Sequence, residues 1–219
     1  MTLSFMAGRS ADAYTDGVGD VARVSGPTQM AISPDGVNLY FGDRNNNRIR
    51  YLNTTTNEIK TLTGAGKDNL FNGNTNEYAE GTACPGQMST GVAGCAYFTR
   101  PTGIAMAPNG KTLYVTDSLN NRIRSVDVAT GVTHLIAGSV KGYRNGIGSA
   151  AHFNLPNNSV VSADGKTLYV VDLQNHVVRM IDIRTKKVST LAGVGKNGHL
   201  DGAFSSAYLS FPDSLAWGS

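Results

Sequence analysis

The sequence predicts an all-β fold built from three copies of one four-stranded unit. One phrase of the chain occurs three times with small changes, as "YFGDRNNNRIRYLN", "YVTDSLNNRIRSVD" and "YVVDLQNHVVRMID". Short runs rich in β-branched and aromatic residues flank each copy, and such runs favour strands. We find no helical spacing of apolar residues. Short strands repeated at a nearly fixed period are typical of a β-propeller, in which each unit forms one blade.

Every unit has the same order of strands and turns. After a proline comes a short apolar first strand, "QMAIS", "GIAMA" or "SVVSA". A tight turn follows, in which glycine supplies a positive φ, at Asp35-Gly36, Asn109-Gly110 and Asp164-Gly165. The second strand is "NLYFGD", "TLYVTD" or "TLYVVD", the third is "RIRYLN", "RIRSVD" or "VVRMID", and the fourth is "IKTLTG", "THLIAG" or "VSTLAG". The three predicted blades span about residues 27–64, 101–138 and 156–193.

This order of signals resembles the NHL repeat. A glycine-rich loop, "F..P.GIA", "DG..LYV.D..N.RIR.ID" and "V.TLAG" together look like the pattern of that family. Asn175-His176-Val177 nearly spells the family's name, and we align Asn47-Arg48-Ile49 and Asn121-Arg122-Ile123 with it as common variants. The resemblance covers nearly the whole chain outside one insertion, and it implies a β-propeller of four-stranded blades.

A glycine-rich loop precedes each unit and occurs four times. Its copies are "DGVGDVARVSGP", "TGVAGCAYFTRP", "NGIGSAAHFNLP" and "DGAFSSAYLSFP". The interval between the first two copies is about 18 residues longer than the other intervals. Asn72-Gly73 already occupies the repeat position that Thr90-Gly91 occupies again, so we place an insertion at about 73–90.

Both ends of the chain resemble parts of a blade. "LSFMAG" (3–8) aligns with a fourth strand, and residues 213–219 align with a first strand, so we expect partial blade strands there within one domain, 1–219. Because propellers close with four to eight blades, we consider a fragment of a longer propeller, a small four-bladed ring, and strand exchange between copies. The candidate assembly strands are Leu3, Ser4, Phe5 and Met6 at one end and Ser214, Leu215, Ala216 and Trp217 at the other.

Aspartate and arginine recur at equivalent positions of the three units. The aspartates that end the second strand are Asp43, Asp117 and Asp172, and the arginines of the third strand are Arg50, Arg124 and Arg179. Catalysis usually needs one odd residue, whereas these residues occur in every unit. We therefore predict a structural role, in which aspartate and arginine brace neighbouring strands or blades.

The sequence offers no catalytic or metal-binding set. The predicted innermost strands contain no His or Glu, and only Asp213 lies beside the last of them. A catalytic metal needs about three protein ligands directed at one point, and the four histidines are dispersed over different segments. We therefore expect no enzyme activity, no metal and no cofactor. The alternative is a fragment of a propeller lyase or hydrolase whose catalytic residues lie outside this chain.

Charge gives no evidence of a nucleic-acid or membrane partner. The formal net charge is +3, the only close basic pair is Lys186-Lys187, and the longest apolar stretches are strand-sized, so we expect no membrane span. Some NHL propellers bind single-stranded RNA, which makes RNA binding a second alternative. The aromatic residues Tyr40, Tyr114 and Tyr169 recur with the repeat, however, which favours core packing over base stacking.

Three features favour an extracellular or cell-surface location. Cys84 and Cys95 lie at the insertion, where a disulfide would fasten an exposed loop. Asn53 and Asn157 begin N-glycosylation sequons. We find no secretion signal in the residues given.

We conclude from the sequence that the chain is a non-enzymatic structural or interaction module. We expect its partners to be other copies of itself or further blades of a longer chain, with protein or glycan partners also open. Copies that complete one another's blades would assemble head to tail into an oligomer or fibril.

Overall fold

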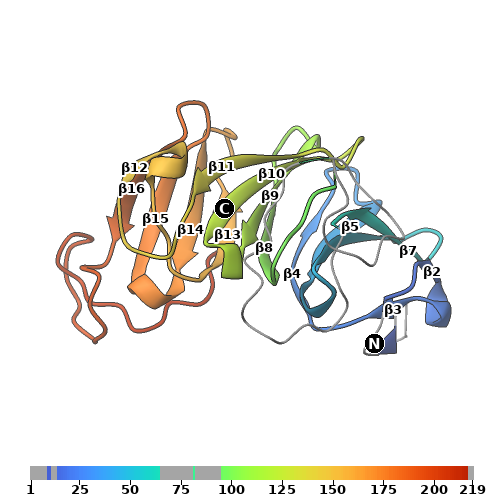
Figure 1. The fold of residues 1–219 in the computed structure, drawn as a ribbon, viewed down its shortest axis with the longest axis horizontal. Helices are drawn as coiled ribbons and strands as arrows, with labels where there is room; N and C mark the ends of the chain where they lie inside the picture. Colours follow the sequence, from blue (N-terminus) through green and yellow to red (C-terminus); the bar gives the residue numbers. More distant parts are fainter. Residues whose placement is uncertain (1–8, 11–13, 65–80, 82–94, 217–219) are drawn as a thin grey trace.

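Three antiparallel sheets stand side by side as blades in Figure 1. The computed structural model describes residues 9–10, 14–64, 81 and 95–216. Strands dominate these residues, and the helical segments are single 3₁₀ turns. The predicted all-β fold and its β-propeller architecture are confirmed.

Each blade is a meander in which consecutive strands are neighbours. Blade 1 contains β4 (Pro27–Ile32), β5 (Asn38–Asp43), β6 (Arg48–Asn53) and β7 (Glu58–Thr63). Blade 2 contains β8 (Pro101–Met106), β9 (Thr112–Asp117), β10 (Arg122–Asp127) and β11 (Thr133–Gly138). Blade 3 contains β13 (Pro156–Val161), β14 (Thr167–Asp172), β15 (Val177–Asp182) and β16 (Lys187–Ala192). The innermost strands β4, β8 and β13 contact one another in sequence order.

A 3₁₀ turn joins the second and third strands of every blade. These turns are η2 (Arg44–Asn46), η3 (Ser118–Asn120) and η5 (Leu173–Asn175). Each ends at a residue in the left-handed region, with φ of 56° at Asn47, 53° at Asn121 and 55° at His176. Asparagine tolerates this conformation better than most residues. The residues equivalent to Asn175-His176-Val177 are therefore Asn46-Asn47-Arg48 and Asn120-Asn121-Arg122, one position earlier than our sequence alignment placed them.

The glycine-rich loops add a short outer strand to the blades. β2 (Gly17–Val18) pairs with β7, and β12 (Gly146–Ile147) pairs with β16. Two further 3₁₀ turns follow these strands, η1 (Gly19–Val21) and η4 (Gly148–Ala150). A Cβ atom at Gly146 would lie 2.9 Å from the Ala150 carbonyl oxygen, so glycine allows the loop to fold back this tightly. The outer edges of blades 1 and 3 are thus partly covered by their own loops.

In blade 2 the outer edge is paired by Gly81. The Thr133 amide donates to the Gly81 carbonyl oxygen at 2.9 Å. The residues at the position of Thr133 in blades 1 and 3 are Ile59 and Val188, which pair with Gly17 and Gly146, respectively. Gly81 precedes Pro101 by twenty residues, whereas Gly17 precedes Pro27 by ten. The additional residues therefore lie on both sides of Gly81, which differs from the single block at 73–90 that we predicted. Thr90-Gly91 lie outside the described residues.

The first, third and fourth loops share a second pairing. β1 (Arg9–Ser10) runs parallel to β3 (Arg23–Val24), and single parallel bridges join Lys141 to Phe153 and Asn197 to Leu209. The fourth loop therefore repeats the geometry of the earlier ones even though no described blade follows it.

Of the partial strands predicted at the ends, only residues 213–216 are described. Ser214, Leu215 and Ala216 form no strand, while residues 3–8 and 217–219 lie outside the described residues. The first strand of a blade pairs with the second strand of the same blade, and among the described residues no second strand follows 213–216. Residues 213–216 therefore form no strand within this chain, and the strand at 3–8 stays a prediction.

Two apolar cores lie between the blades. Leu113 and Val115 of β9 pack with Tyr40 of blade 1, and the alternating residue Tyr114 packs with Leu168 of blade 3. Blade 2 is therefore buried on both faces, as the period-2 alternation of a strand permits. No helix within the described ranges is long and apolar enough to cross a membrane.

Candidate functional site

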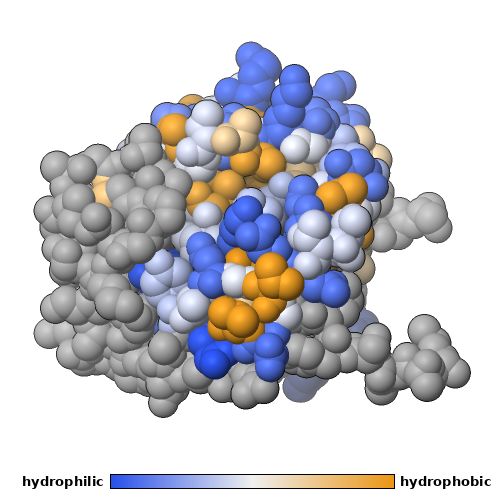
Figure 2. All heavy atoms as spheres, turned by 90° about the vertical axis from the view of Figure 1, so that its right-hand side faces the viewer, coloured by the Kyte–Doolittle hydropathy of each residue, from blue (hydrophilic) through white to orange (hydrophobic). Residues whose placement is uncertain are grey.

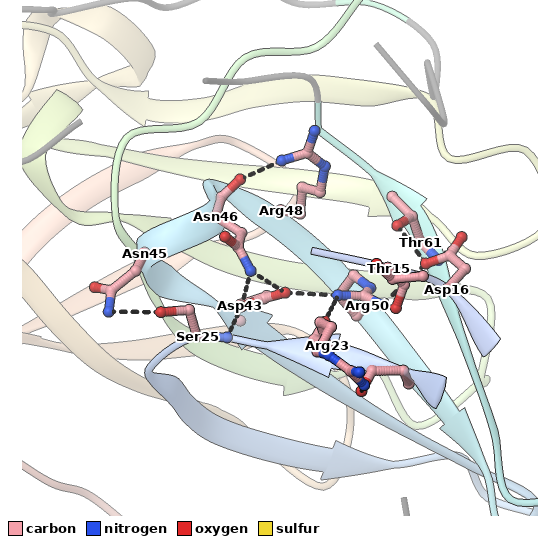
Figure 3. Close-up of polar contacts among 12 residues, drawn as sticks. Thr15, Asp16, Arg23, Ser25, Asp43, Asn45, Asn46, Arg48, Arg50 and Thr61 are labelled. Atoms are coloured by element: carbon pink, nitrogen blue, oxygen red, sulfur yellow. Dashed lines mark hydrogen bonds and ion pairs between the residues drawn. The ribbon is translucent and has the colours of Figure 1, made fainter. Parts of the chain in front are cut away.

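The repeated aspartate and arginine form one buried ion pair in each blade (Figure 3 shows that of blade 1). The distances from Arg Nη1 to Asp Oδ2 are 2.6 Å for Arg50–Asp43, 3.3 Å for Arg124–Asp117 and 2.7 Å for Arg179–Asp172, and all six side chains are fully buried. Aspartate ends the second strand and arginine lies on the neighbouring third strand, so the pair links these two strands.

Each aspartate also binds the glycine-rich loop and the 3₁₀ turn. Its Oδ1 accepts the amide of Ser25 at 2.8 Å, of Thr99 at 2.7 Å or of Asn154 at 2.8 Å. The turn asparagines Asn46, Asn120 and Asn175 donate their side-chain amides to the same carboxylates. Burial raises the pKa of the Asp43, Asp117 and Asp172 carboxyls, and these hydrogen bonds and the arginines oppose that rise.

The arginines fasten the loops to the blades. Arg179 donates to the carbonyl oxygens of His152 at 3.1 Å and Arg144 at 3.0 Å, and to Asn145 Oδ1 at 2.8 Å. In blade 1, Arg50 donates to the carbonyl oxygens of Arg23 at 3.0 Å and Thr15 at 2.9 Å. The terminal nitrogens of these arginines and the carboxylates are engaged within the protein, and all six side chains are buried, so the clusters hold the fold together.

A second feature is a polar hollow of about 330 Å³ at the start of the inner strands. We call it the inner hollow. Thr28 and Gln29 of β4, Thr102 of β8, and Asn157 and Asn158 of β13 line it. Arg44 of η2 and the segment Asp213-Ser214 complete its wall.

Gln29 joins the inner strands of all three blades beside this hollow. Its Oε1 accepts the amides of Ile104 at 3.0 Å and Ser159 at 3.2 Å, and its Nε2 donates to the Ser159 carbonyl oxygen at 3.0 Å. Gly103 allows the strands to approach, because a Cβ there would lie 2.6 Å from Thr116 Oγ1 and closer still to the Asn157 carbonyl oxygen.

Sequence reasoning missed most of the residues that line the inner hollow. They occupy positions at which the repeats disagree: Gln29 corresponds to Gly103 and Asn158, and Arg44 corresponds to Ser118 and Leu173. We searched for odd residues among histidines and carboxylates, and noted only Asp213. Comparing every repeat position for disagreement would have found Arg44.

A third feature is an exposed apolar surface on blade 1, formed by Met30 and Ile32, which we call the first-blade face. Beside it, Leu39 is partly buried against Phe41 and its neighbours. Met30 and Ile32 of β4 are 58% and 55% exposed. Figure 2 views the molecule from the blade 1 end and shows apolar side chains (orange) among polar ones there. The equivalent Ile104 of blade 2 is only 1% exposed, because blade 1 covers it.

The remaining predicted site residues are partly described. Asn53 Oδ1 accepts the amides of Thr55 at 2.9 Å and Thr56 at 3.0 Å in an exposed turn, and Asn157 donates its side-chain amide to Asp213. Cys95 is fully buried, but Cys84 lies outside the described residues, so the disulfide stays a prediction.

The histidines lie apart from one another. The Nδ1 atom of His176 accepts the Phe211 amide at 3.1 Å. In the part of the chain that the structure describes, no three His, Cys, Asp or Glu side chains come together to hold a metal ion.

Known proteins with the same repeat were compared with this chain. No protein-family model matches it. It is 29% identical over 171 residues, 76% of its length, to human NHL repeat-containing protein 2. The strand order of the blades and the asparagines in their turns support the same resemblance as this relative does. The chain is similar to NHL repeat-containing proteins.

Other relatives extend the NHL-repeat comparison. The chain is 27% identical over 202 residues, 88% of its length, to the chloroplastic protein Suppressor of Quenching 1 of Arabidopsis thaliana. These alignments cover 22% of the human protein and 17% of the plant protein, so the chain spans about a fifth of the length of the curated relatives it matches. An auxiliary nutrient binding protein from Bacteroides thetaiotaomicron matches 89% of this chain and 43% of its own, with a TM-score of 0.64 and 19% identity. That similarity shows the propeller fold.

Proposed function

We propose that the chain is a non-enzymatic interaction module whose first-blade face docks the third blade of a second copy. One observation carries the proposal: Met30 and Ile32 are exposed, although the equivalent residues of the other two blades pack against a preceding blade. The chain thus contains two examples of a blade-on-blade contact that Met30 and Ile32 do not make with any described residue.

The far side of blade 3 offers the matching surface. Val160 and Tyr169 correspond to Ala31 and Tyr40 of blade 1. Ala31 and Tyr40 pack against blade 2 in the apolar core between blades 1 and 2. Both are partly exposed. The fourth glycine-rich loop is tied to this end by the bond from the Phe211 amide to His176, so it would flank the incoming blade. Docking of blade on blade differs from the strand exchange suggested by the sequence, in which residues 214–216, which form no strand within this chain, would add to a blade of another copy.

The proposal is tested by light-scattering mass over a range of concentrations. We expect the mass of the unaltered chain to rise with concentration and that of a Met30→Lys, Ile32→Lys double variant to stay at one copy. Each buried side chain contributes about 1.5 kcal/mol or more, roughly tenfold in the association constant. The control is Ile147→Lys, since Ile147 is 63% exposed at the outer edge of blade 3. A chain that remains single at every concentration overturns the proposal, as does association that the double variant retains.

We also propose an extracellular or cell-surface location, supported by the predicted Cys84–Cys95 disulfide and the two sequons. Non-reducing mass analysis should give a mass two protons below that of the reduced chain. Labelling of free thiols at both cysteines in unreduced protein would contradict the disulfide, and with it the main support for this location.

A further inference from the structure

We infer that the inner hollow binds a small hydroxylated carboxylate of the sugar-acid class, with its carboxylate on Arg44. At about 330 Å³ the hollow has the size of a small-molecule site. The side chains that line it are all polar, and they include one cation and one carboxylate. Such a lining favours a ligand that carries both charge and hydroxyl groups over an apolar one.

Arg44 supplies the positive charge. Its Nε is buried and has no hydrogen-bond partner, and no carboxylate of the described residues lies within ion-pair distance of its guanidinium. The blade does not require an arginine here, because Ser118 and Leu173 occupy the same position in the other two blades. A guanidinium binds a carboxylate through two parallel hydrogen bonds, which makes an acid its best-matched ligand.

A second arginine strengthens the positive potential. Burial lowers the pKa of Arg100, and the nearby charge of Arg44 lowers it further, which places two guanidinium groups in one region. Two neighbouring like charges destabilise each other, so an anion bound at Arg44 would relieve that repulsion.

The opposite wall carries groups suited to hydroxyls. Asn157 donates its side-chain amide to Asp213, and Asn158 Oδ1 accepts the Leu215 amide at 3.1 Å. These bonds fix the two asparagines and leave Asn157 Oδ1, Asn158 Nδ2 and the second carboxylate oxygen of Asp213 for a ligand. A hydroxyl both donates and accepts, so neighbouring ring hydroxyls match this mixture of acceptors and a donor.

The wall is rigid before any ligand binds. Gln29 ties β4 to β8 and β13, and Gly103 lets the inner strands approach closely. Because the hollow does not have to be assembled on binding, little binding energy is lost to ordering.

The experiment compares D-glucuronate with D-glucose by titration calorimetry, since the two differ by the carboxylate on the same hydroxylated ring. It uses the chain carrying Met30→Lys and Ile32→Lys, so that self-association does not affect the readout and the two proposals can fail separately. We expect glucuronate to bind at least tenfold more tightly than glucose, and Arg44→Gln to abolish that preference. The matched control is Arg184→Gln, because Arg184 is an exposed turn arginine remote in sequence from the hollow.

Three results overturn the inference: no heat with glucuronate, equal affinity for the two sugars, or an Arg44→Gln variant that keeps the preference. Asn158→Ala gives an independent measure, since it should weaken both sugars without removing the preference for the acid. Circular dichroism of each variant identifies any that fails to fold. If Arg44→Gln does not fold, Arg44→Lys replaces it: the preference should fall but persist, and an unchanged preference overturns the inference.

Discussion

Replacing Arg179 with methionine should destabilise the protein more than any exposed substitution. The Arg179 side chain is fully buried, pairs with Asp172 at 2.7 Å, and holds the third glycine-rich loop through three further acceptors. Methionine fills much of the volume but bonds to none of these groups. The variant therefore leaves a buried carboxylate without its cation.

Removing one partner of a buried ion pair costs about 3–5 kcal/mol. A domain of this size has roughly 5–15 kcal/mol of stability in total, so the variant should lose a large share of it.

The loss of stability should depend on pH. Burial already raises the pKa of Asp172, and removing the arginine raises it further. A carboxyl whose folded pKa is raised binds a proton more readily in the folded state, so the variant should recover stability as pH falls through that folded pKa.

Urea unfolding followed by far-ultraviolet circular dichroism measures this free energy at neutral pH and at about pH 5. Arg184→Met is the control, and we expect it to change the free energy of unfolding by about 0.5 kcal/mol or less, because Arg184 is exposed. Should Arg179→Met not fold, Arg179→Lys keeps the charge while losing the forked hydrogen bonds and should give an intermediate loss. A loss below about 1 kcal/mol for Arg179→Met would refute the view that these pairs hold loops and strands together.

Two other substitutions test the close packing and the turns. Gly103→Ala should lower the free energy of unfolding by about 1–3 kcal/mol, because its Cβ would crowd the Asn157 carbonyl oxygen. The control is Gly202→Ala, whose Cβ is close only to the end of a flexible side chain. Equal losses of stability for the two variants in thermal unfolding would contradict this prediction. Asp182 has its pKa lowered, first by the Thr185 hydroxyl and then by the Thr185 amide. The stabilising effect of the Asp182 carboxylate is therefore present above its ordinary pKa of 3.8 and lost as pH falls through the lower folded pKa, and Asp182→Asn should lack that loss in acid. A difference between the two proteins that stays constant with pH would exclude the carboxylate as its source.

The blades and their turns could be predicted because their signals are local. Apolar residues alternate with a period of two along a strand. Tight turns need conformations that few residue types adopt, so glycine, asparagine and aspartate mark them in the sequence. The repeated Asp and Arg were recognisable as structural for the same reason, since Asp43 and Arg50 lie seven residues apart on neighbouring strands. Even here, our alignment of the repeats was shifted by one residue at Asn47. Asn46 and Asn47 are identical in sequence, and only the left-handed φ of Asn47 distinguishes them.

The end strands and the loop of blade 2 were beyond such reasoning. The segment around Leu215 has the pattern of a first strand, but a strand needs a neighbouring strand for its backbone hydrogen bonds. No described strand pairs with this segment, and a local pattern does not reveal whether a partner strand is present. Gly81 pairs with Thr133, 52 positions later, and no local signal distinguishes it from the other glycines of the insertion.

The sequence by itself determined the strand order, the turns and the resemblance to NHL-repeat proteins, since each depends on residues close together in the chain. Only the tertiary structure decided which surfaces are free. Met30 is exposed and its counterpart in blade 2 is covered because blades pack face to face in three dimensions. The inner hollow likewise joins groups far apart in sequence, as Gln29 and Ser159 show with 130 positions between them. Local preferences shape each blade, whereas packing between blades creates the surfaces that a partner or ligand can meet.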